Sequence, residues 1–436
     1  MKITIIGGGS IFTPLLLNGL IKYSKELHVD QVALLDIDIK AAKRIGNYCR
    51  YFLQDKFEHP IEIIPTVDHK EAISDSDYII FTIRVGGLKA RINDEKIPMK
   101  YGIFGDETTG AGGFSNSLRT IPVIIDYAKE IEKWAPNAWV ILFTNPEGIL
   151  TEAISKNSNV NVIGLCTAPF ALLVGLAKYL KVKRSRISLD FVGLTHTGWV
   201  RGIFLDGIDI MPNFLKEANI KDVMSAGFKS IYYPIEIIKQ LSFIPAHWFY
   251  ALAGYQVPHW YYHRDRVYQL QKDAGETRGE ELLKIQKDLI DDIEDKRINI
   301  NDLKKRRGHQ VLDEPILSLI SAIQNNKNEI HIVDIPNDGC LSFFDPGAII
   351  EMPALINKTG AHPMPIPNLS PEVRGLMQAV KAYEELTIQA AVKGSYELAL
   401  RALLAHPLIM SYEISKPLLD DILEANKKYL PKYWKL

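Results

Sequence analysis

The opening stretch, MKITIIGGGSIFTP, places a short apolar strand directly before a glycine-rich turn. Ile3–Ile6 is the expected strand, Gly7–Gly9 the turn, and Thr13-Pro14 the start of an apolar helical run. We expect Thr13 to cap that helix and Pro14 to lie in its first turn, where a missing N–H is harmless. Glycines permit a tight turn and the close approach of a pyrophosphate, which the amides of a helix N-terminus attract. This pattern predicts a dinucleotide-binding fold at the start of the chain.

A glycine-rich turn is a weak motif alone, because such a turn is often only structural. Here the next expected strand, QVALLDID from Gln31, ends in Asp36. A carboxylate at this position holds both ribose hydroxyls of an adenosine, which favours NAD over its 2′-phosphorylated relative. The alternative is a structural turn with a surface aspartate. The predicted cofactor contacts are Gly7, Gly8, Gly9, Ser10, Ile11, Asp36 and Arg84.

Composition excludes several classes of protein. The 436 residues are enough for two domains, and the net charge of −1 gives no electrostatic case for nucleic acid or membrane as the main partner. No N-terminal signal peptide is recognisable, and no uncharged run reaches the roughly 20 residues that span a bilayer. Three scattered cysteines do not form a disulfide framework, so a cytoplasmic protein is expected. The basic residues 304–307 are expected to form a solvated face.

The first half alternates strand-like and helix-like segments. Short β-branched or aromatic runs recur at 31–36, 61–64, 78–83, 139–143, 162–165 and 187–194. Their spacing leaves room for helices, which predicts an α/β fold: a Rossmann-like, mainly parallel sheet flanked by helices. The second half is expected to be α+β, with a long amphipathic stretch at about 371–405. We therefore expect an NAD-binding domain at 1–195 and a closely packed substrate, metal and oligomerisation domain at 196–436.

Ligands of such sheets bind at the carboxyl ends of the strands. The segment from Ile83 to Asn116 follows one strand end and is too rich in glycine and polar residues to be a packed element, so a functional loop is expected. Asn145, directly before Pro146 at another strand end, can bond a ribose or a substrate hydroxyl, or can simply form an Asn-Pro turn. Cys166 and His196 follow two further strands and could share a divalent metal, although a cysteine there is usually part of the core.

Taken together, these segments resemble glycoside hydrolase family 4, the NAD- and divalent-metal-dependent glycosidases, and most closely its 6-phospho-β-glucosidases. The anchors cover nearly the whole chain: GGGSIFTP, the RVGG to GGF segment, TNP, GLC, the GL-H turn, ETR at 276–278, KRRG at 305–308 and NDG at 337–339. This family is an exception to two-carboxylate glycoside hydrolysis. An ordered set of motifs is specific where one motif would not be.

The resemblance implies a mechanism. NAD would take a hydride from C3 of the sugar, a base would remove the C2 proton, the aglycone would leave by elimination, and water addition and hydride return would complete the cycle. By the same resemblance, Cys166 and His196 would bind the metal, expected to be Mn²⁺, which stabilises the enolate as a Lewis acid. Arg91 and Asn145 would bind substrate, and Arg278 would contact a sugar phosphate. Glu107 would lie beside the base.

The chain departs from the family pattern near the chemistry. Thr167 stands where the phospho-glucosidases have Asn or Asp, and its hydroxyl cannot act as a carboxylic acid. Thr195 replaces an Asn, Asp106 replaces a Gln, and the base tyrosine aligns with Pro258. The candidates for the base are therefore Tyr255, His259 and Tyr261.

Two other functions remain open from the sequence. One is a net oxidoreductase resembling lactate and malate dehydrogenases, which share the sheet and an Asn-Pro turn. The other is a relative that binds NAD and sugar without turnover, as the missing tyrosine would allow. The expected partner is a small glycoside, with or without a 6-phosphate, and the expected assembly is a homodimer or homotetramer.

Overall fold

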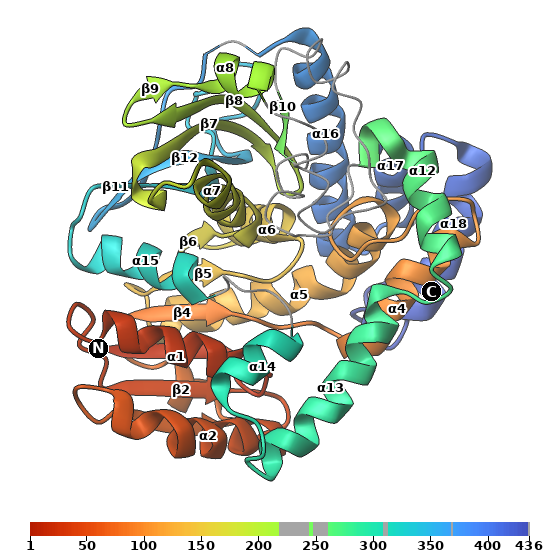
Figure 1. Cartoon of the computed structure of the whole chain (residues 1–436). Helices are drawn as coiled ribbons and strands as arrows, with labels where there is room; N and C mark the ends of the chain where they lie inside the picture. Colours follow the sequence, from red (N-terminus) through yellow and green to blue (C-terminus); the bar gives the residue numbers. More distant parts are fainter. Residues whose placement is uncertain (218–243, 247–259, 308–312, 368, 435–436) are drawn as a thin grey trace.

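The computed structural model describes residues 1–217, 244–246, 260–307, 313–367 and 369–434. In these ranges one thirteen-stranded sheet runs through the molecule in the order β10-β8-β7-β12-β11-β6-β5-β4-β1-β2-β3, with β13 paired to β12 and β9 to β8 (Figure 1). The strands are β1 (Lys2–Ile6), β2 (Gln31–Leu35), β3 (Glu62–Thr66), β4 (Tyr78–Phe81), β5 (Trp139–Leu142), β6 (Asn161–Gly164), β7 (Ile187–Leu194), β8 (Thr197–Leu205), β9 (Ile208–Asp209), β10 (Ile244–Pro245), β11 (Glu329–Pro336), β12 (Ile349–Asn357) and β13 (Gly360–Pro363).

Helices pack around this sheet. They are α1 (Thr13–Tyr23), α2 (Ile39–Leu53), α3 (His69–Ile73), α4 (Gly87–Met99), α5 (Gly110–Trp134), α6 (Glu147–Asn157), α7 (Thr167–Leu180), α8 (Met211–Glu217), α12 (Trp260–Asp273), α13 (Arg278–Glu294), α14 (Ile300–Arg307), α15 (Asp313–Gln324), α16 (Pro371–Lys393), α17 (Tyr396–Ala405) and α18 (Tyr412–Asn426), with short 3₁₀ turns at Gln54–Lys56 and Arg184–Arg186. Within the described ranges, none of the helices has the length and apolar character that a bilayer crossing requires.

The six strands of the first half form the predicted parallel sheet. Every neighbouring pair in the series β3-β2-β1-β4-β5-β6 is parallel, which is the strand order of a dinucleotide-binding fold. Their apolar residues are almost continuously buried, because helices cover both faces of the sheet. The Rossmann-like prediction is confirmed, and the carboxyl ends of these strands meet at one edge.

The second part of the sheet is antiparallel. The predicted strand 187–194 exists as β7, but it runs antiparallel to β8 and β12 and does not belong to a βαβ unit. The reason lies in the connection: β7 ends at Leu194 and β8 begins at Thr197, and a loop this short allows only antiparallel pairing. In Figure 1 these strands occupy the upper end of the sheet and the parallel strands the lower end.

The prediction of an unpacked loop at 83–116 is wrong. This segment contains α4 and the start of α5, and most of its residues are buried. Its buried charges are paired: Arg91 Nε lies 2.8 Å from Glu95 Oε1 within the segment, and Asp94 Oδ2 lies 2.6 Å from Nη2 of Arg119, further along α5. Composition therefore predicted a loop where polar side chains are buried against one another.

Two further local predictions need correction. The N-cap of α1 is Phe12, and Thr13 is the first helical residue, although Pro14 does lie in the first turn as predicted. The amphipathic stretch 371–405 forms α16 and α17, which are separated where Gly394 adopts φ +64°. Val380 and Tyr383 of α16 are buried, as the helical spacing predicts.

Candidate active site

The glycine turn is docked on the end of β2. The amides of Gly7 and Gly8 both donate to Leu35 O, at 2.8 and 2.9 Å, and Gly9 N donates to Asp36 Oδ2 at 2.9 Å. A Cβ on Gly8 would lie 2.6 Å from Leu34 Cα, so a side chain has no room there. The structure thus brings the predicted turn, the start of α1 and Asp36 together.

Three neighbours complete this region. The Ser10 hydroxyl accepts from Phe12 N at 3.2 Å, and Ile11 packs against the core beside the turn. Ile37, which the sequence analysis did not single out, is 94% exposed next to Asp36. Arg84, a predicted cofactor contact, directs its guanidinium at Glu107, and its contact with the cofactor stays a prediction.

Glu107 is the centre of a buried ionic site. Its carboxylate accepts from Arg91 Nη1 at 2.5 Å and from Arg84 Nε at 3.0 Å. Burial alone would raise the pKa of Glu107, but the charges of Arg84 and Arg91 outweigh it and lower the pKa to about 2. Glu107 is therefore ionised throughout the physiological range.

Arg278 is brought to this site by the packing of α13 against α4. Arg91 Nε also donates to Glu95 Oε1 at 2.8 Å, and Glu95 Oε2 accepts from Gly279 N at 2.7 Å in the first turn of α13. Thr277 and Glu280 cap α13 reciprocally, which fixes its start. Arg278 itself pairs with Glu281 at 2.5 Å and is about one-third exposed.

Arg307 overturns the prediction that 304–307 is wholly a solvated face. Burial and, after it, the like charges of Arg84, Arg278 and Arg91 together lower the pKa of Arg307 to about 10. Its Nη1 is buried and has no hydrogen-bond partner in the part of the chain that the structure describes. We call Arg84, Arg91, Arg278 and Arg307 the arginine cluster. The arrangement favours an anion, because one would both satisfy a donor and relieve repulsion.

Asn145 occupies the turn between β5 and α6, before a cis peptide bond to Pro146. Its side-chain amide nitrogen lies 3.0 Å from Glu147 Oε1 and 3.1 Å from Thr108 Oγ1. Asn116 Nδ2 donates to Asn145 O at 2.9 Å and to Glu107 O at 3.1 Å, so one side chain joins this turn to the segment of Glu107. Asn116 was not singled out from the sequence, since helical asparagines carry no motif of their own.

Asp106, the residue before Glu107, caps the backbone that follows it. Its Oδ1 accepts from Thr108 N at 2.8 Å and from Thr109 N at 3.0 Å. Burial raises the pKa of Asp106 to about 6 in spite of these bonds. The residue therefore shapes the turn that presents Glu107.

Of the predicted metal ligands, Cys166 is buried and His196 is partly buried. Cys166 is the N-cap of α7, and its Sγ accepts from Ala168 N at 3.5 Å. Burial raises the pKa of the Cys166 thiol, and nearby carboxylates raise it further. Burial lowers the pKa of His196 to about 4, so its imidazole is neutral, as a metal ligand must be.

Cys166 and His196 are the two donors predicted to share a divalent metal. The described residues contain no group of three or more His, Cys, Asp and Glu side chains arranged around a metal. A thiolate and an imidazole suit first-row divalent metals, and two protein donors would leave positions for oxygen atoms of a substrate and water. The donor chemistry of Cys166 and His196 therefore fits a catalytic metal whose coordination a ligand completes.

Three buried acids lie behind Cys166. Burial raises the pKa of Glu147 and of Glu351 well above the ordinary value, and that of Asp334 to about 6. Asp334 and Glu351 are cross-strand neighbours on β11 and β12. We call these three residues the carboxylate cluster. A signal for it exists in the sequence, since Asp334 and Glu351 interrupt the apolar strand runs HIVDIP and IIEMPALIN.

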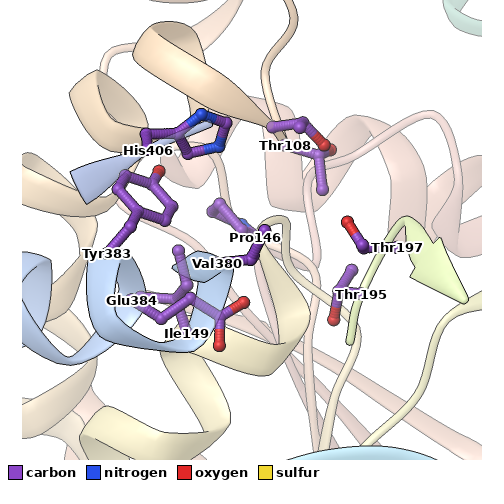
Figure 2. A pocket seen from close by; sticks show the side chains of 10 residues that line it. Thr108, Pro146, Ile149, Thr195, Thr197, Val380, Tyr383, Glu384 and His406 are labelled. Carbon is purple, nitrogen blue, oxygen red and sulfur yellow. The ribbon is translucent and has the colours of Figure 1, made fainter. Parts of the chain in front are cut away.

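A cavity opens between these elements, as Figure 2 shows. Thr195 and Thr197, on either side of His196, line one wall, and Tyr383, Glu384 and His406 line the other, with Pro146 between them. The remaining lining residues are Thr108, Thr109, Ile149 and Val380. The cavity thus adjoins the segments that carry Glu107, Asn145 and His196.

Four predicted catalytic residues remain: Thr167, Tyr255, His259 and Tyr261. Thr167 is the first residue of α7, directly after Cys166, and is partly exposed. Tyr261 lies in the first turn of α12, and Tyr255 and His259 fall outside the described residues. The identity of the base remains a prediction.

Comparison with known proteins identifies the class to which this fold and site belong. The family model for family 4 glycosyl hydrolases matches residues 2–182, and that for the C-terminal domain of the same family matches residues 191–409. The chain belongs to the family 4 glycosyl hydrolases, and it is a glycosidase. The resemblance recognised in the sequence is confirmed.

The relatives are similar over their whole length. A probable 6-phospho-β-glucosidase of Bacillus subtilis is 35% identical over 443 residues, which covers 100% of this chain and 98% of the relative. The 6-phospho-β-glucosidase of Thermotoga maritima, solved with NAD and glucose-6-phosphate, has a TM-score of 0.88 at 30% identity over 99% of both chains. A second structure of that enzyme, with manganese, NAD⁺ and glucose-6-phosphate, has a TM-score of 0.84 at 30% identity over 99% of both chains.

Proposed function

We propose that this chain hydrolyses 6-phospho-β-glucosides with NAD and a divalent metal, Mn²⁺ in the first instance. The observation that supports a phosphorylated substrate is the arginine cluster: Nη1 of Arg307 is buried among like charges and has no hydrogen-bond partner among the described residues. A phosphate is the anion that guanidinium groups bind best, through paired charge-assisted hydrogen bonds. The names of the relatives and the ligands of the solved structures support the same substrate.

Separate groups of residues would bind NAD and the metal. Gly7–Gly9 and the start of α1 would hold the pyrophosphate, and Asp36 the adenosine ribose, with the exposed side chain of Ile37 beside it. Cys166 and His196 would hold the metal. When bound, NAD supplies a reversible hydride acceptor and the metal a Lewis acid for the sugar oxygens.

Substrate binding and proton transfer fall to the polar residues between these sites. Arg91 and Asn145 would orient the sugar, and Arg278 would share its phosphate with Arg307. The C2 base is one of Tyr255, His259 and Tyr261, and ionised Glu107 beside it would increase its basicity. Thr167 offers a neutral hydroxyl, so protonation of the leaving group would come from water.

We also propose the division into an NAD-binding domain at 1–195 and a substrate, metal and oligomerisation domain at 196–436. The continuous sheet supports close packing of the two. A homodimer or homotetramer is the proposed assembly, which light scattering on the purified protein would measure.

The test compares release of nitrophenol from 4-nitrophenyl 6-phospho-β-glucoside, its α-anomer and both unphosphorylated glucosides. We expect turnover of the phosphorylated β-glucoside only when NAD, Mn²⁺ and a thiol reductant are present. Deuterium incorporation at C2 of the product sugar, in D₂O, would report the base directly. Hydrolysis that survives complete removal of NAD, or a preference for unphosphorylated glucosides, would contradict the proposal.

A further inference from the structure

Thr195 bridges two segments that are distant in sequence. Its hydroxyl accepts from Gly148 N at 2.8 Å and donates to Asp334 Oδ1 at 3.2 Å, and all three groups are buried. A hydroxyl can do both at once, since it carries one donor and two acceptor positions. The bridge joins the β7–β8 turn to the first turn of α6 and to β11.

Each end of the bridge leads to a residue of the proposed site. Gly148 is three residues after Asn145, at the start of α6. Asp334 is paired with Gly164 of β6, two residues before Cys166. Thr195 itself directly precedes His196. The bridge therefore connects the segments that carry the two proposed metal ligands and a proposed substrate ligand.

The bridge also restrains an unfavourable backbone conformation. His196 adopts φ +62°, in the left-handed region, which a non-glycine residue keeps only where its surroundings enforce it. The two hydrogen bonds of Thr195 fix the position immediately before His196. They act on the backbone of the turn and so on the direction of the imidazole.

The bridge packs closely against two glycines. A Cβ on Gly148 would lie 2.7 Å from Thr195 Oγ1 and 3.4 Å from Asp334 Oδ1. On the opposite side, a Cβ on Gly164 would lie 2.8 Å from the Cβ of Asp334. Two glycines thus allow the carboxylate and the hydroxyl to approach the backbones that they tie together.

We propose that Thr195, held by Asp334 and Gly148, is a positioning residue that sets the geometry of His196 relative to Cys166 and Asn145. The proposal rests on the proposed function, because it assumes that Cys166 and His196 bind the metal. Groups that orient metal ligands without touching the metal commonly change affinity by 10–100-fold. The consequence here is a metal affinity that depends on one hydroxyl.

The experiment measures Mn²⁺ affinity directly, from the electron paramagnetic resonance signal of free Mn²⁺, without substrate or turnover. Thr195→Val keeps the shape and removes the hydroxyl, and we expect it to weaken Mn²⁺ binding roughly tenfold. Thr195→Ser keeps the hydroxyl and should bind within about twofold of the wild type, by the same reasoning. Gly148→Ala places a Cβ against the Thr195 hydroxyl at the other end of the bridge, and it should weaken Mn²⁺ binding to a similar extent.

Thr4→Val is the matched control. Thr4 is a buried strand residue whose hydroxyl also contacts two groups, Ala72 O and Ser76 Oγ, and it lies in β1, away from the β7–β8 turn. We expect this variant to lose stability but to keep its Mn²⁺ affinity. The thermal midpoint of each variant, measured without metal, separates misfolding from lost positioning.

The outcomes separate the two proposals. If the wild type binds Mn²⁺ and Thr195→Val and Gly148→Ala bind it equally well, the positioning role is wrong and the proposed function stands. If Thr195→Val and Thr4→Val weaken binding equally, the effect is general destabilisation and the positioning role is again wrong. If the wild type binds no divalent metal, the proposed metal site fails, and the positioning role fails with it.

Discussion

Glu107, at the arginine cluster, and the acids of the carboxylate cluster are all buried, yet their pKa values shift in opposite directions. In the first, Glu107 lies between Arg84 and Arg91, and its pKa falls to about 2 although burial opposes this. In the second, Asp334 and Glu351 face each other, and their pKa values rise. The difference teaches that the neighbours of a buried acid, more than its depth, decide its charge.

The two clusters also suit different tasks. The arginine cluster holds fixed charges, and among the described residues one of its donors has no partner, so it is prepared for an anionic ligand. In the carboxylate cluster the pKa of each acid is raised, which favours protonation and reduces the negative charge behind the cysteine. Isosteric Glu→Gln substitutions should therefore change the free energy of unfolding at pH 7 far more at Glu107 than in the carboxylate cluster.

The largest effect is expected for Glu107→Gln. This change removes the negative charge that Arg84 and Arg91 share and leaves both guanidinium groups uncompensated. We expect the free energy of unfolding at pH 7 to fall by about 3 kcal/mol, as for other broken buried ion pairs. Urea denaturation followed by circular dichroism measures this.

The same variant has a signed pH dependence. The pKa of Glu107 is about 2 in the folded protein, below its ordinary value, so its contribution is complete above about 4.5 and is lost as the pH falls toward 2. The stability difference between wild type and Glu107→Gln should thus shrink between pH 5 and pH 3. A difference that stays constant over this range would show that Glu107 does not act through its charge.

An intermediate effect is expected for Arg307→Gln. Removing this charge should raise KM for a 6-phosphorylated substrate roughly 30-fold, since one charge-assisted hydrogen bond is worth about 2 kcal/mol. The stability of the free protein should stay equal or rise, because the pKa of Arg307 is already lowered by burial and by like charges. Steady-state kinetics and thermal unfolding test the two halves of this prediction.

Arg306→Gln is the matched control. Arg306 lies next to Arg307 on α14, but its side chain is exposed and pairs with Asp292. We expect KM to change less than twofold, as for exposed ion pairs of little net energy. Equal effects of the two substitutions would mean that the arginine cluster does not bind phosphate.

The smallest effect is expected for Glu351→Gln. Burial raises the pKa of Glu351 well above its ordinary value, and Asp334 and Glu147 raise it further, which favours the protonated form. The neutral amide of glutamine resembles the protonated carboxyl in size and charge. We therefore expect the free energy of unfolding to change by less than about 1 kcal/mol at pH 7. A loss as large as that of Glu107→Gln would show that Glu351 is charged and would remove the contrast between the clusters.

Glu351 changes the stability with pH in the direction opposite to Glu107. The folded protein keeps the Glu351 proton where the unfolded chain has lost it, so wild-type stability falls as the pH rises above about 4.5. In Glu351→Gln the free energy of unfolding should depend less on pH. Urea denaturation of the wild type and the variant at pH 5 and pH 8 measures this.

Much of the fold could be predicted from the sequence because it depends on local patterns. The strand at Ile3–Ile6, the glycine turn and the acid at Asp36 are each readable within a few residues, and the parallel order follows from their spacing. The largest failure concerns buried polar residues. The segment 83–116 looked like a loop because its polar residues were counted as solvated, whereas Asp94 and Arg119 bury each other.

The sequence by itself determined the dinucleotide-type half and the family, and with them Asp36, Cys166 and His196 as the residues to examine. Tertiary structure alone brought Arg307 to Glu107 and joined Thr195 to Asp334, across separations of 200 and 139 residues. The physical reason is that propensity and periodicity act over neighbouring residues. The charge of a buried group and the direction of a ligand are instead set by elements that meet only when the chain folds.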